Sequence, residues 1–513
     1  MSEGTLGSVV GEKATTIDRV KGRDRDYGSV LWQQPHLLDL SYQELQQRNL
    51  EIKMERLKGA TSDQVKDRML DYLRKEPGIK AVLVCFCDLE GRLHTLDYDK
   101  DFIVDGEDNL TFDGSSIAGF TALEQSDLRL KADWASFRFL PADLFGPGKV
   151  MVFGNVCNAD GSYYASDFRS VLMNFCRDLY QARGITVNVA PEVEGFLFAG
   201  DKCEQCFDEK AGFELATMSG YFSSLPQDTL RLFIDKFAEV KRALAFQNEK
   251  DHPEVAPAQF ELNFRYGPAL DNADQIMLYK LIARQVASSM GLTASFLPKP
   301  VANLNGSGMH MNMSIARDGK NTFYDASGKH LLSTEAHRFL TGILYRAYDV
   351  CLLMNSSVNS YRRLDPNFEA PNEIKMSPID RGSMVRVPMG NEKSARIEVR
   401  TVAPDANPYL CTYALLKAGF EGIDADNETL KEMEGVVYKE EVEKLPGDIY
   451  TALNDFKESP FIGDIMGEDS QRKYAELKEA TADRSPRALG KKVKAREVLD
   501  HHEVRNQLIW KDF

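Results

Sequence analysis

The feature that most constrains this chain is a strand-like run with two acidic side chains, Ala190-Pro-Glu-Val-Glu-Gly-Phe-Leu-Phe198. The residues just before it, Ile185 to Val189, are alternating and rich in β-branched side chains. They predict a strand over 185–198 that breaks briefly at Pro191. Residues i and i+2 of a strand face the same way, so Glu192 and Glu194 point together. Two carboxylates about 5 Å apart repel by roughly 3 kcal/mol at an effective dielectric of about 20. Such a pair needs a cation, unless this side of the strand simply faces solvent, which is the commoner arrangement for a single Glu-x-Glu.

Length and charge restrict the class of protein. With 513 residues and a formal net charge of −15, we expect two domains, one of them large, and no nucleic-acid partner. We see no signal peptide and no apolar run near the roughly 18 residues of a membrane span, so we expect a cytoplasmic protein without a membrane partner. The cysteines form no disulfide framework, and Cys203-x-x-Cys206 alone is a weak zinc candidate.

The order of predicted elements indicates an α+β fold. Helical periodicity over 39–58 would bury Leu45, Met54 and Leu57, and a second amphipathic helix follows over 62–75. Strands come in consecutive hairpin-like groups, which favours a largely antiparallel sheet. We predict three regions: an N-terminal arm and helix (1–60), a small strand-rich domain (61–158), and a large domain with a helical C-terminal part (159–513).

Further acids recur within apolar, strand-like sequence. Glu254 lies seven residues before Glu261, His310 alternates with methionines, and Glu398 alternates with arginines. Each alone is more commonly a surface acid or a satisfied core histidine. Together with the first pair they would line one sheet face and hold Mg²⁺ or Mn²⁺, since both ions prefer oxygen ligands and one imidazole tilts the choice toward Mn²⁺.

Cations gather among apolar neighbours in one short stretch. Arginine suits bidentate binding of phosphate and carboxylate, and metals plus arginines are the usual equipment of phosphoryl transfer, although a solvated charged face is the general alternative. The loop Asn305-Gly-Ser-Gly308 is not a Walker loop, but its glycines would let backbone approach a small ligand. The cations are Arg363, Arg381, Arg386, Lys393, Arg396 and Arg400.

Seven motifs in one order resemble those of the glutamine synthetase family, over residues 79 to 425. They are Asp113-Gly-Ser-Ser116, Pro191-Glu-Val-Glu194, Glu254 to Glu261, Asn305-Gly-Ser-Gly-Met-His310, Asn359-Ser-Tyr-Arg-Arg-Leu364, Arg396-Ile-Glu-Val-Arg400 and Ala406-Asn-Pro-Tyr-Leu410. The resemblance implies a small β-grasp domain and a large catalytic domain with a curved, mainly antiparallel sheet and flanking helices. It also implies a homo-oligomer with intersubunit active sites, as a dodecamer of two stacked hexameric rings.

The resemblance also implies a role for each site residue. One metal would be held by Glu194, Glu254 and Glu261, and the other by Glu192, His310 and Glu398. Glutamate would meet Arg363, Arg400, Asn305 and Gly306. ATP would meet Glu249, Ser314, Arg386, Lys393 and Arg396, with Arg381 facing the transferred phosphoryl group. The ammonium pocket would comprise Asp113, Ser116, Tyr221 and Glu369, of which Asp113 comes from the neighbouring subunit.

The implied reaction is ATP-dependent ligation of ammonia to the γ-carboxylate of L-glutamate through γ-glutamyl phosphate, with two or three Mg²⁺ or Mn²⁺ ions. Two alternatives stay open. One is a γ-glutamyl ligase for a larger amine, such as methylamine, ethanolamine or a polyamine; the other is a non-catalytic nitrogen-sensing homologue. The chain departs from the family pattern at several positions. Asn312 replaces a histidine of many bacterial members, Ala258 a glycine, and Gly195 an aromatic residue, and Asp380-Arg-Gly-Ser-Met384 replaces the common Asn-Arg-Ser-Ala pattern.

Overall fold

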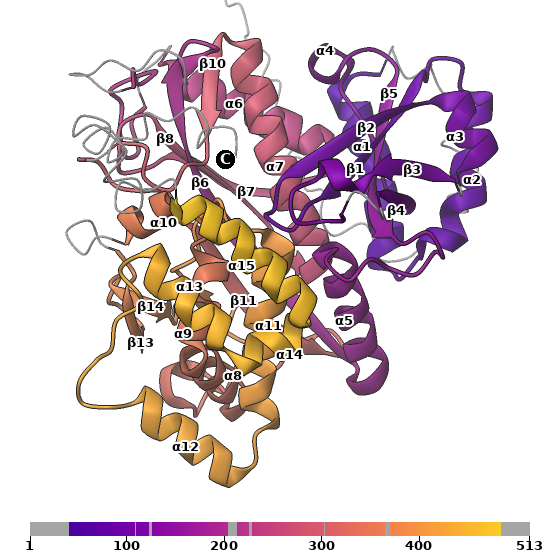
Figure 1. Ribbon diagram of the computed structural model, residues 1–513. Coiled ribbons are helices and arrows are strands. Elements are labelled where there is room, and N and C mark those ends of the chain that lie inside the picture. The colour runs from indigo at the N-terminus through magenta and orange to yellow at the C-terminus, as the bar shows by residue number, and fades with distance from the viewer. Residues whose placement is uncertain are drawn as a thin grey trace, which may run out of the picture.

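The computed structural model describes residues 40–107, 109–122, 126–203, 213–224, 228–301, 303–364 and 370–483. The smaller of two sheets has five strands in the order β2-β1-β5-β4-β3. Only β1 and β5 run parallel within it. Figure 1 shows this sheet, with α2 and α3 beside it, as a separate layer on the right of the molecule. Its strands are β1 (Ala81–Cys87), β2 (Leu93–Asp99), β3 (Leu110–Asp113), β4 (Asp127–Phe139) and β5 (Lys149–Cys157).

The larger sheet has ten strands, with the main order β13-β14-β15-β11-β6-β8-β7. Along this path only β13 and β14 pair in parallel, so the prediction of a largely antiparallel sheet is confirmed. The strands are β6 (Ile185–Ala199), β7 (Asn248–Pro253), β8 (Gln259–Phe264), β9 (Gly267–Pro268), β10 (Leu292–Ser295), β11 (Met309–Arg317), β12 (Lys320–Asn321), β13 (Glu373–Ser377), β14 (Ser383–Arg386) and β15 (Ile397–Val399).

Helices pack against the larger sheet, and in the described part of the chain five more helices, α11 to α15, follow its last strand. Figure 1 shows α6 and α7 beside β6, β7 and β8, whereas α8 to α15 gather at the lower left. The helices are α1 (Tyr42–Leu57), α2 (Ser62–Lys75), α3 (Lys100–Gly106), α4 (Ala142–Phe145), α5 (Phe168–Arg183), α6 (Thr229–Ala243), α7 (Ala269–Ser289), α8 (Thr334–Tyr345), α9 (Ala347–Met354), α10 (Val358–Arg363), α11 (Pro408–Asp424), α12 (Asn427–Val437), α13 (Ile449–Glu458), α14 (Pro460–Met466) and α15 (Glu468–Asp483).

The break predicted at Pro191 is wrong, because β6 runs unbroken from Ile185 to Ala199. Antiparallel pairing alternates the edge toward which a residue's backbone groups point. Glu194 donates its N–H to Gly308 at 3.0 Å, on the β11 side. The backbone N–H and C=O groups of the odd-numbered residues of β6 therefore point to the other edge. No described strand pairs with Pro191 on that edge, so its lack of an N–H breaks no hydrogen bond of the sheet.

Helix α1 has the predicted extent but buries a different face. Met54 and Leu57 are 42% and 38% exposed, while Arg48, Asn49 and Lys53 are buried with Leu45. Asn49 bonds the backbone of Phe139 in β4 and of Ala243 in α6, so a polar face joins the two halves of the molecule. Apolar periodicity alone could not show this, because long polar side chains bury their stems when their ends find partners.

Two further expectations concern membranes and zinc. Within the described ranges, none of the helices combines the length and apolar character that a membrane crossing requires. Cys203 is buried, whereas Cys206 lies outside the described residues. The zinc hypothesis for this pair therefore stays a prediction.

Candidate active site

Strand register gathers the predicted acids on one face of the larger sheet. His310 of β11 lies opposite Glu192 of β6, and Glu194 lies opposite Glu261 of β8. On β6 the odd-numbered residues from 185 to 193 are buried and the even-numbered ones are half-buried. This alternation confirms that Glu192 and Glu194 point together.

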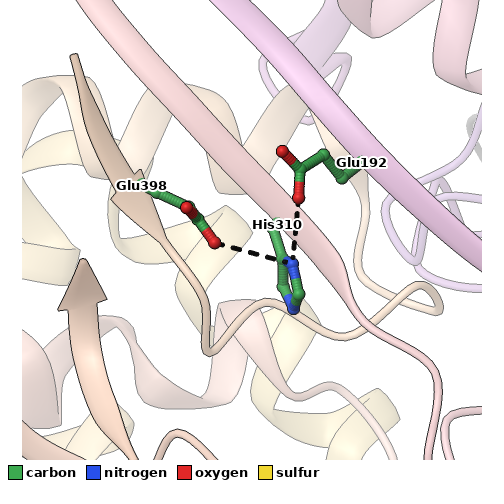
Figure 2. Close-up of side chains that lie close together, drawn as sticks. All are labelled: Glu192, His310 and Glu398. Atoms are coloured by element: carbon green, nitrogen blue, oxygen red, sulfur yellow. Dashed lines mark hydrogen bonds and ion pairs between the residues drawn. The ribbon is translucent and has the colours of Figure 1, made fainter. Parts of the chain in front are cut away.

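Three of these side chains form a ligand-like cluster. Figure 2 shows Glu192, His310 and Glu398 converging from three strands, β6, β11 and β15. His310 Nδ1 lies 3.3 Å from Glu192 Oε2 and 3.8 Å from Glu398 Oε1. One potential ligand atom from each lies within 4.8 Å of the others. The family resemblance implied this set as the ligands of one metal.

The surroundings keep this cluster anionic and its imidazole neutral. Burial and the nearby Arg400 lower the pKa of His310, which leaves a ring nitrogen available as a ligand. Burial disfavours ionised Glu192, but its interactions with His310, Asn312 and Arg396 together outweigh burial and lower the pKa of Glu192 to about 2. Glu398 is fully buried and forms ion pairs with both Arg386 and Arg400. Arg400 Nη1 lies 2.5 Å from Glu398 Oε1.

A second cluster lies across β6 and contains a residue that the sequence analysis missed. His252 Nδ1 lies 3.4 Å from Glu254 and its Nε2 lies 3.5 Å from Glu261. These three side chains also place ligand atoms within 4.8 Å of one another. The only sequence signal was a histidine two residues before Glu254; its place opposite Glu261 depends on the pairing of β7 with β8.

Glu194 borders this second cluster and is forced close to its acids. Burial, then the charges of Glu254 and Glu261, raise the pKa of Glu194 well above its usual range. Burial and Glu261 raise the pKa of Glu254 to about 7. The buried Nε2 of His252 has no hydrogen-bond partner among the described residues. Crowded carboxylates with an imidazole beside them fit a divalent cation.

Gly306 and Gly308 leave room for the Arg363 side chain to lie close to the first cluster. Arg363 is buried and donates to the carbonyls of Thr401 and Arg400, both at 2.9 Å. A β-carbon at Gly308 would lie 2.7 Å from both Arg363 Nη2 and His310 Nε2. Gly306 is similarly crowded by the Arg363 side chain, at 2.9 Å. Asn305 is half-buried in the same loop.

The residues assigned to ATP lie mostly along the sheet face. Ser314 follows His310 and Asn312 at every second position of β11. Asn312 donates to Glu192 Oε1 at 3.0 Å and accepts from Arg396 Nε at 2.8 Å. It therefore links the first cluster to a predicted nucleotide contact. Arg386 pairs with Glu398 as described above, whereas three other assigned residues are exposed: Glu249, Arg381 and Lys393.

The predicted ammonium pocket is divided between the two sheets. Asp113 ends β3 and accepts hydrogen bonds from the Ser115 amide, at 2.9 Å, and from the Ser116 hydroxyl. Figure 1 shows β3 within the smaller sheet, apart from the strands that carry the acids. Tyr221 does lie near the second cluster: its ring centroid is 6.2 Å from that of His252. Glu369 lies outside the described residues.

Known proteins resemble this chain over most of its length. Among curated relatives, glutamine synthetase of Clostridium saccharobutylicum is 35% identical over 423 residues, covering 80% of this chain and 94% of the relative. That of Methanosarcina mazei is 36% identical over 417 residues, covering 79% and 91%. A cryo-EM structure of Plasmodium falciparum glutamine synthetase shares the fold, with a TM-score of 0.74 at 23% identity over 84% of this chain and 97% of that one.

A solved complex of GmaS with ADP is also similar, with a TM-score of 0.70 at 26% identity over 84% of this chain and 99% of that one. Family models match twice: the β-grasp domain of glutamine synthetase over residues 78–159 and its catalytic domain over residues 165–493. The α+β fold, the two acidic clusters and these matches agree with the sequence motifs. The chain belongs to the glutamine synthetase family of enzymes.

Proposed function

We propose that the protein ligates ammonia to the γ-carboxylate of L-glutamate at the expense of ATP, through γ-glutamyl phosphate, and releases glutamine, ADP and phosphate. The observation that carries this proposal is the pair of clusters, Glu192 with His310 and Glu398, and His252 with Glu254 and Glu261, on one sheet face. Two or three Mg²⁺ or Mn²⁺ ions, held there with Glu194, would neutralise the phosphate charge.

Cationic side chains around the first cluster support the substrate assignments. A carboxylate becomes an acyl donor only when its oxygen becomes a leaving group, which phosphorylation achieves. Arg363 and Arg400, with the loop of Asn305 and Gly306, would hold the glutamate. Arg381 would face the transferred phosphoryl group and stabilise its charge. ATP would lie against Glu249, Ser314, Arg386, Lys393 and Arg396.

The ammonium pocket requires two subunits in this proposal. Asp113 and Ser116 of one chain would meet Tyr221 and Glu369 of the next, because the smaller sheet lies apart from the acids of its own chain. Asp113 would accept a proton from ammonium, which cannot attack while charged. We propose a dodecamer of two stacked hexameric rings in the cytoplasm.

The direct test is an assay of glutamine formation with ATP, glutamate, ammonium and either Mg²⁺ or Mn²⁺. We expect one glutamine and one phosphate per ATP, and loss of turnover in Glu398→Gln. Phosphate release without glutamine, or no turnover with ammonium, would contradict the proposal.

A larger amine is the second candidate, and one observation favours it. Tyr221 and Phe222 stack with ring centroids 3.8 Å apart, are half or more exposed, and both lie edge-on to His252. Such a pair offers an apolar wall and a cation–π surface for an alkylammonium group. Rates with methylamine, ethanolamine and polyamines, measured against ammonium, decide between the two. A non-catalytic homologue is less consistent with the two complete clusters.

A further inference from the structure

Strand β6 has a gap in its pairing beside the two clusters. On one edge it pairs with β8 from Phe196 to Glu194 and with β9 at Val189 and Asn188. Between these stretches, over residues 190–193, the described strands offer it no partner on that edge. On the other edge β11 pairs with it continuously from Ile185 to Val193. The sheet is therefore split next to Glu192 and Glu194.

Two side chains of α7 fill this gap. The Tyr279 hydroxyl accepts from the Leu262 N–H at 3.1 Å and donates to the Val193 carbonyl at 2.9 Å. Asn272 donates to the Val189 carbonyl at 2.5 Å and to that of Arg265 at 3.3 Å. The two residues are seven apart and so lie on one face of the helix. The hydroxyl replaces the backbone hydrogen bond that would continue the ladder from the Glu194–Glu261 pair.

Helix α6 also contacts the backbone of Leu262, through Lys241. Lys241 is fully buried, donates to the Leu262 carbonyl at 2.8 Å, and lies 3.6 Å from Asp251 of β7. Its ammonium group lies within 5.7 Å of the ring centroids of Phe237, Phe264 and Tyr279. Both backbone groups of Leu262 are thus bonded by helix side chains.

These contacts lie directly behind the metal-ligand candidates. Val193 separates Glu192 from Glu194, and Leu262 follows Glu261. Because side chains alternate along a strand, the helices hold the covered face while the acids project from the other. A shift of β8 toward β6 would move Glu261 and His252 relative to Glu192 and His310.

We propose that Tyr279 is a positioning residue: its hydroxyl, wedged between Val193 and Leu262 and supported by Lys241, fixes the separation of the two clusters. This role rests on the proposed metal-binding function of those acids. Removing the hydroxyl leaves the Val193 carbonyl and the Leu262 N–H without partners in a dry interior, so the two strands would close or admit water.

The test compares Tyr279→Phe with the intact full-length protein in Mn²⁺ binding, followed by electron paramagnetic resonance. We expect at least about tenfold weaker binding and a changed Mn²⁺ spectrum, as for other residues that orient metal ligands. Tyr164→Phe is the matched control, because the buried Tyr164 hydroxyl also donates to a carbonyl, of Phe120, and accepts from Lys473. The control should lose comparable thermal stability and keep its Mn²⁺ affinity within about twofold.

Two outcomes overturn the proposal. One is wild-type Mn²⁺ affinity and spectrum in Tyr279→Phe, and the other is equal weakening in both variants. Lys241→Met, which keeps the buried stem and removes the bond to Leu262, provides an independent second test with the same expected direction. If the unmodified protein binds no Mn²⁺, the proposed metal function itself fails, which is distinguishable from failure of Tyr279 alone.

Discussion

Gly195 and Ala258 show how single residues shape the sheet beside the site. A β-carbon on Gly195 would lie 2.7 Å from Phe260 and 3.0 Å from Phe296, so these rings occupy the volume of the aromatic side chain that the family pattern places at 195. Ala258 has a φ of 58°, in the left-handed region that glycine adopts without strain. Its replacement of the family glycine therefore retains the turn at some cost in backbone energy.

We expect Gly195→Ala to lower the free energy of unfolding by about 1–3 kcal/mol, because the methyl group collides with two buried rings. Gly435→Ala is the control: nothing lies within 4 Å of a β-carbon there, and the residue is inside α12. That variant should be slightly stabilised, since alanine favours a helix. Thermal unfolding of both variants checks the opposite signs, and destabilisation by both would contradict them.

The raised pKa of Glu254, about 7, predicts pH-dependent metal binding. A ligand must be deprotonated, so Mn²⁺ affinity should rise as the pH increases from 6 to 8, and Glu254→Gln should weaken binding and flatten that rise. Glu239→Gln, at an exposed position of α6, is the control. Isothermal titration calorimetry at several pH values measures the Mn²⁺ affinity. An equally steep increase of affinity with pH in Glu254→Gln would contradict the assignment.

The raised pKa of Glu254 also determines how the stability of the metal-free protein changes with pH. The folded pKa lies above the ordinary value of 4.5, so between that value and about 7 the folded state binds more protons than the unfolded one. The contribution of Glu254 to stability is therefore present at low pH and is lost as the pH rises through this window. Added Mn²⁺ should restore stability at the upper end.

At the scale of elements, α1 joins the two sheets by polar contacts. Lys53 donates to Gln275 at 2.9 Å, and Arg56 lies 2.7 Å from Asp133 of β4 and 2.5 Å from Asp271 of α7. Arg56 is half-buried and paired with two carboxylates, so removing one partner is costly, whereas the buried Lys53 is held by neutral acceptors. The helix lies before residue 78, where the match to the family's β-grasp domain begins.

Asn49→Ala tests this role of α1. The substitution leaves the Phe139 N–H and two carbonyls without their partner, so we expect a destabilisation of about 2–4 kcal/mol. Met54→Ser should change stability little, because that side chain is 42% exposed. Thermal unfolding midpoints of the two variants decide whether the polar face or the apolar periodicity holds the helix; a larger loss in Met54→Ser would contradict the structure.

At the scale of the whole molecule, the proposed active site depends on assembly. Asp113 lies on the smaller sheet and the acids on the larger one, and the family match covers both. If the site is intersubunit, Asp113→Asn and Glu398→Gln should each be inactive. Mixed oligomers of the two variants should regain part of the activity, because some interfaces combine two intact halves.

Co-expression of the two variants with different affinity tags, followed by purification through both tags, provides those mixed oligomers. Turnover of the mixture is compared with each variant alone, and mass photometry gives the oligomer size. No recovery in verified mixed oligomers would contradict an intersubunit site. The domain boundaries at residues 60 and 158 stay predictions that this experiment does not address.

The sequence by itself determined the fold class, the common face of Glu192 and Glu194, and the first acidic cluster. Period-two alternation and apolar flanks are local properties, and the motif order identified the family. The register of β7 against β8, the split beside β6 and the polar face of α1 were decided only by the tertiary structure. His252, Tyr279 and Asn49 gain their roles from partners far along the chain, and no local pattern records which strand or helix a side chain will meet.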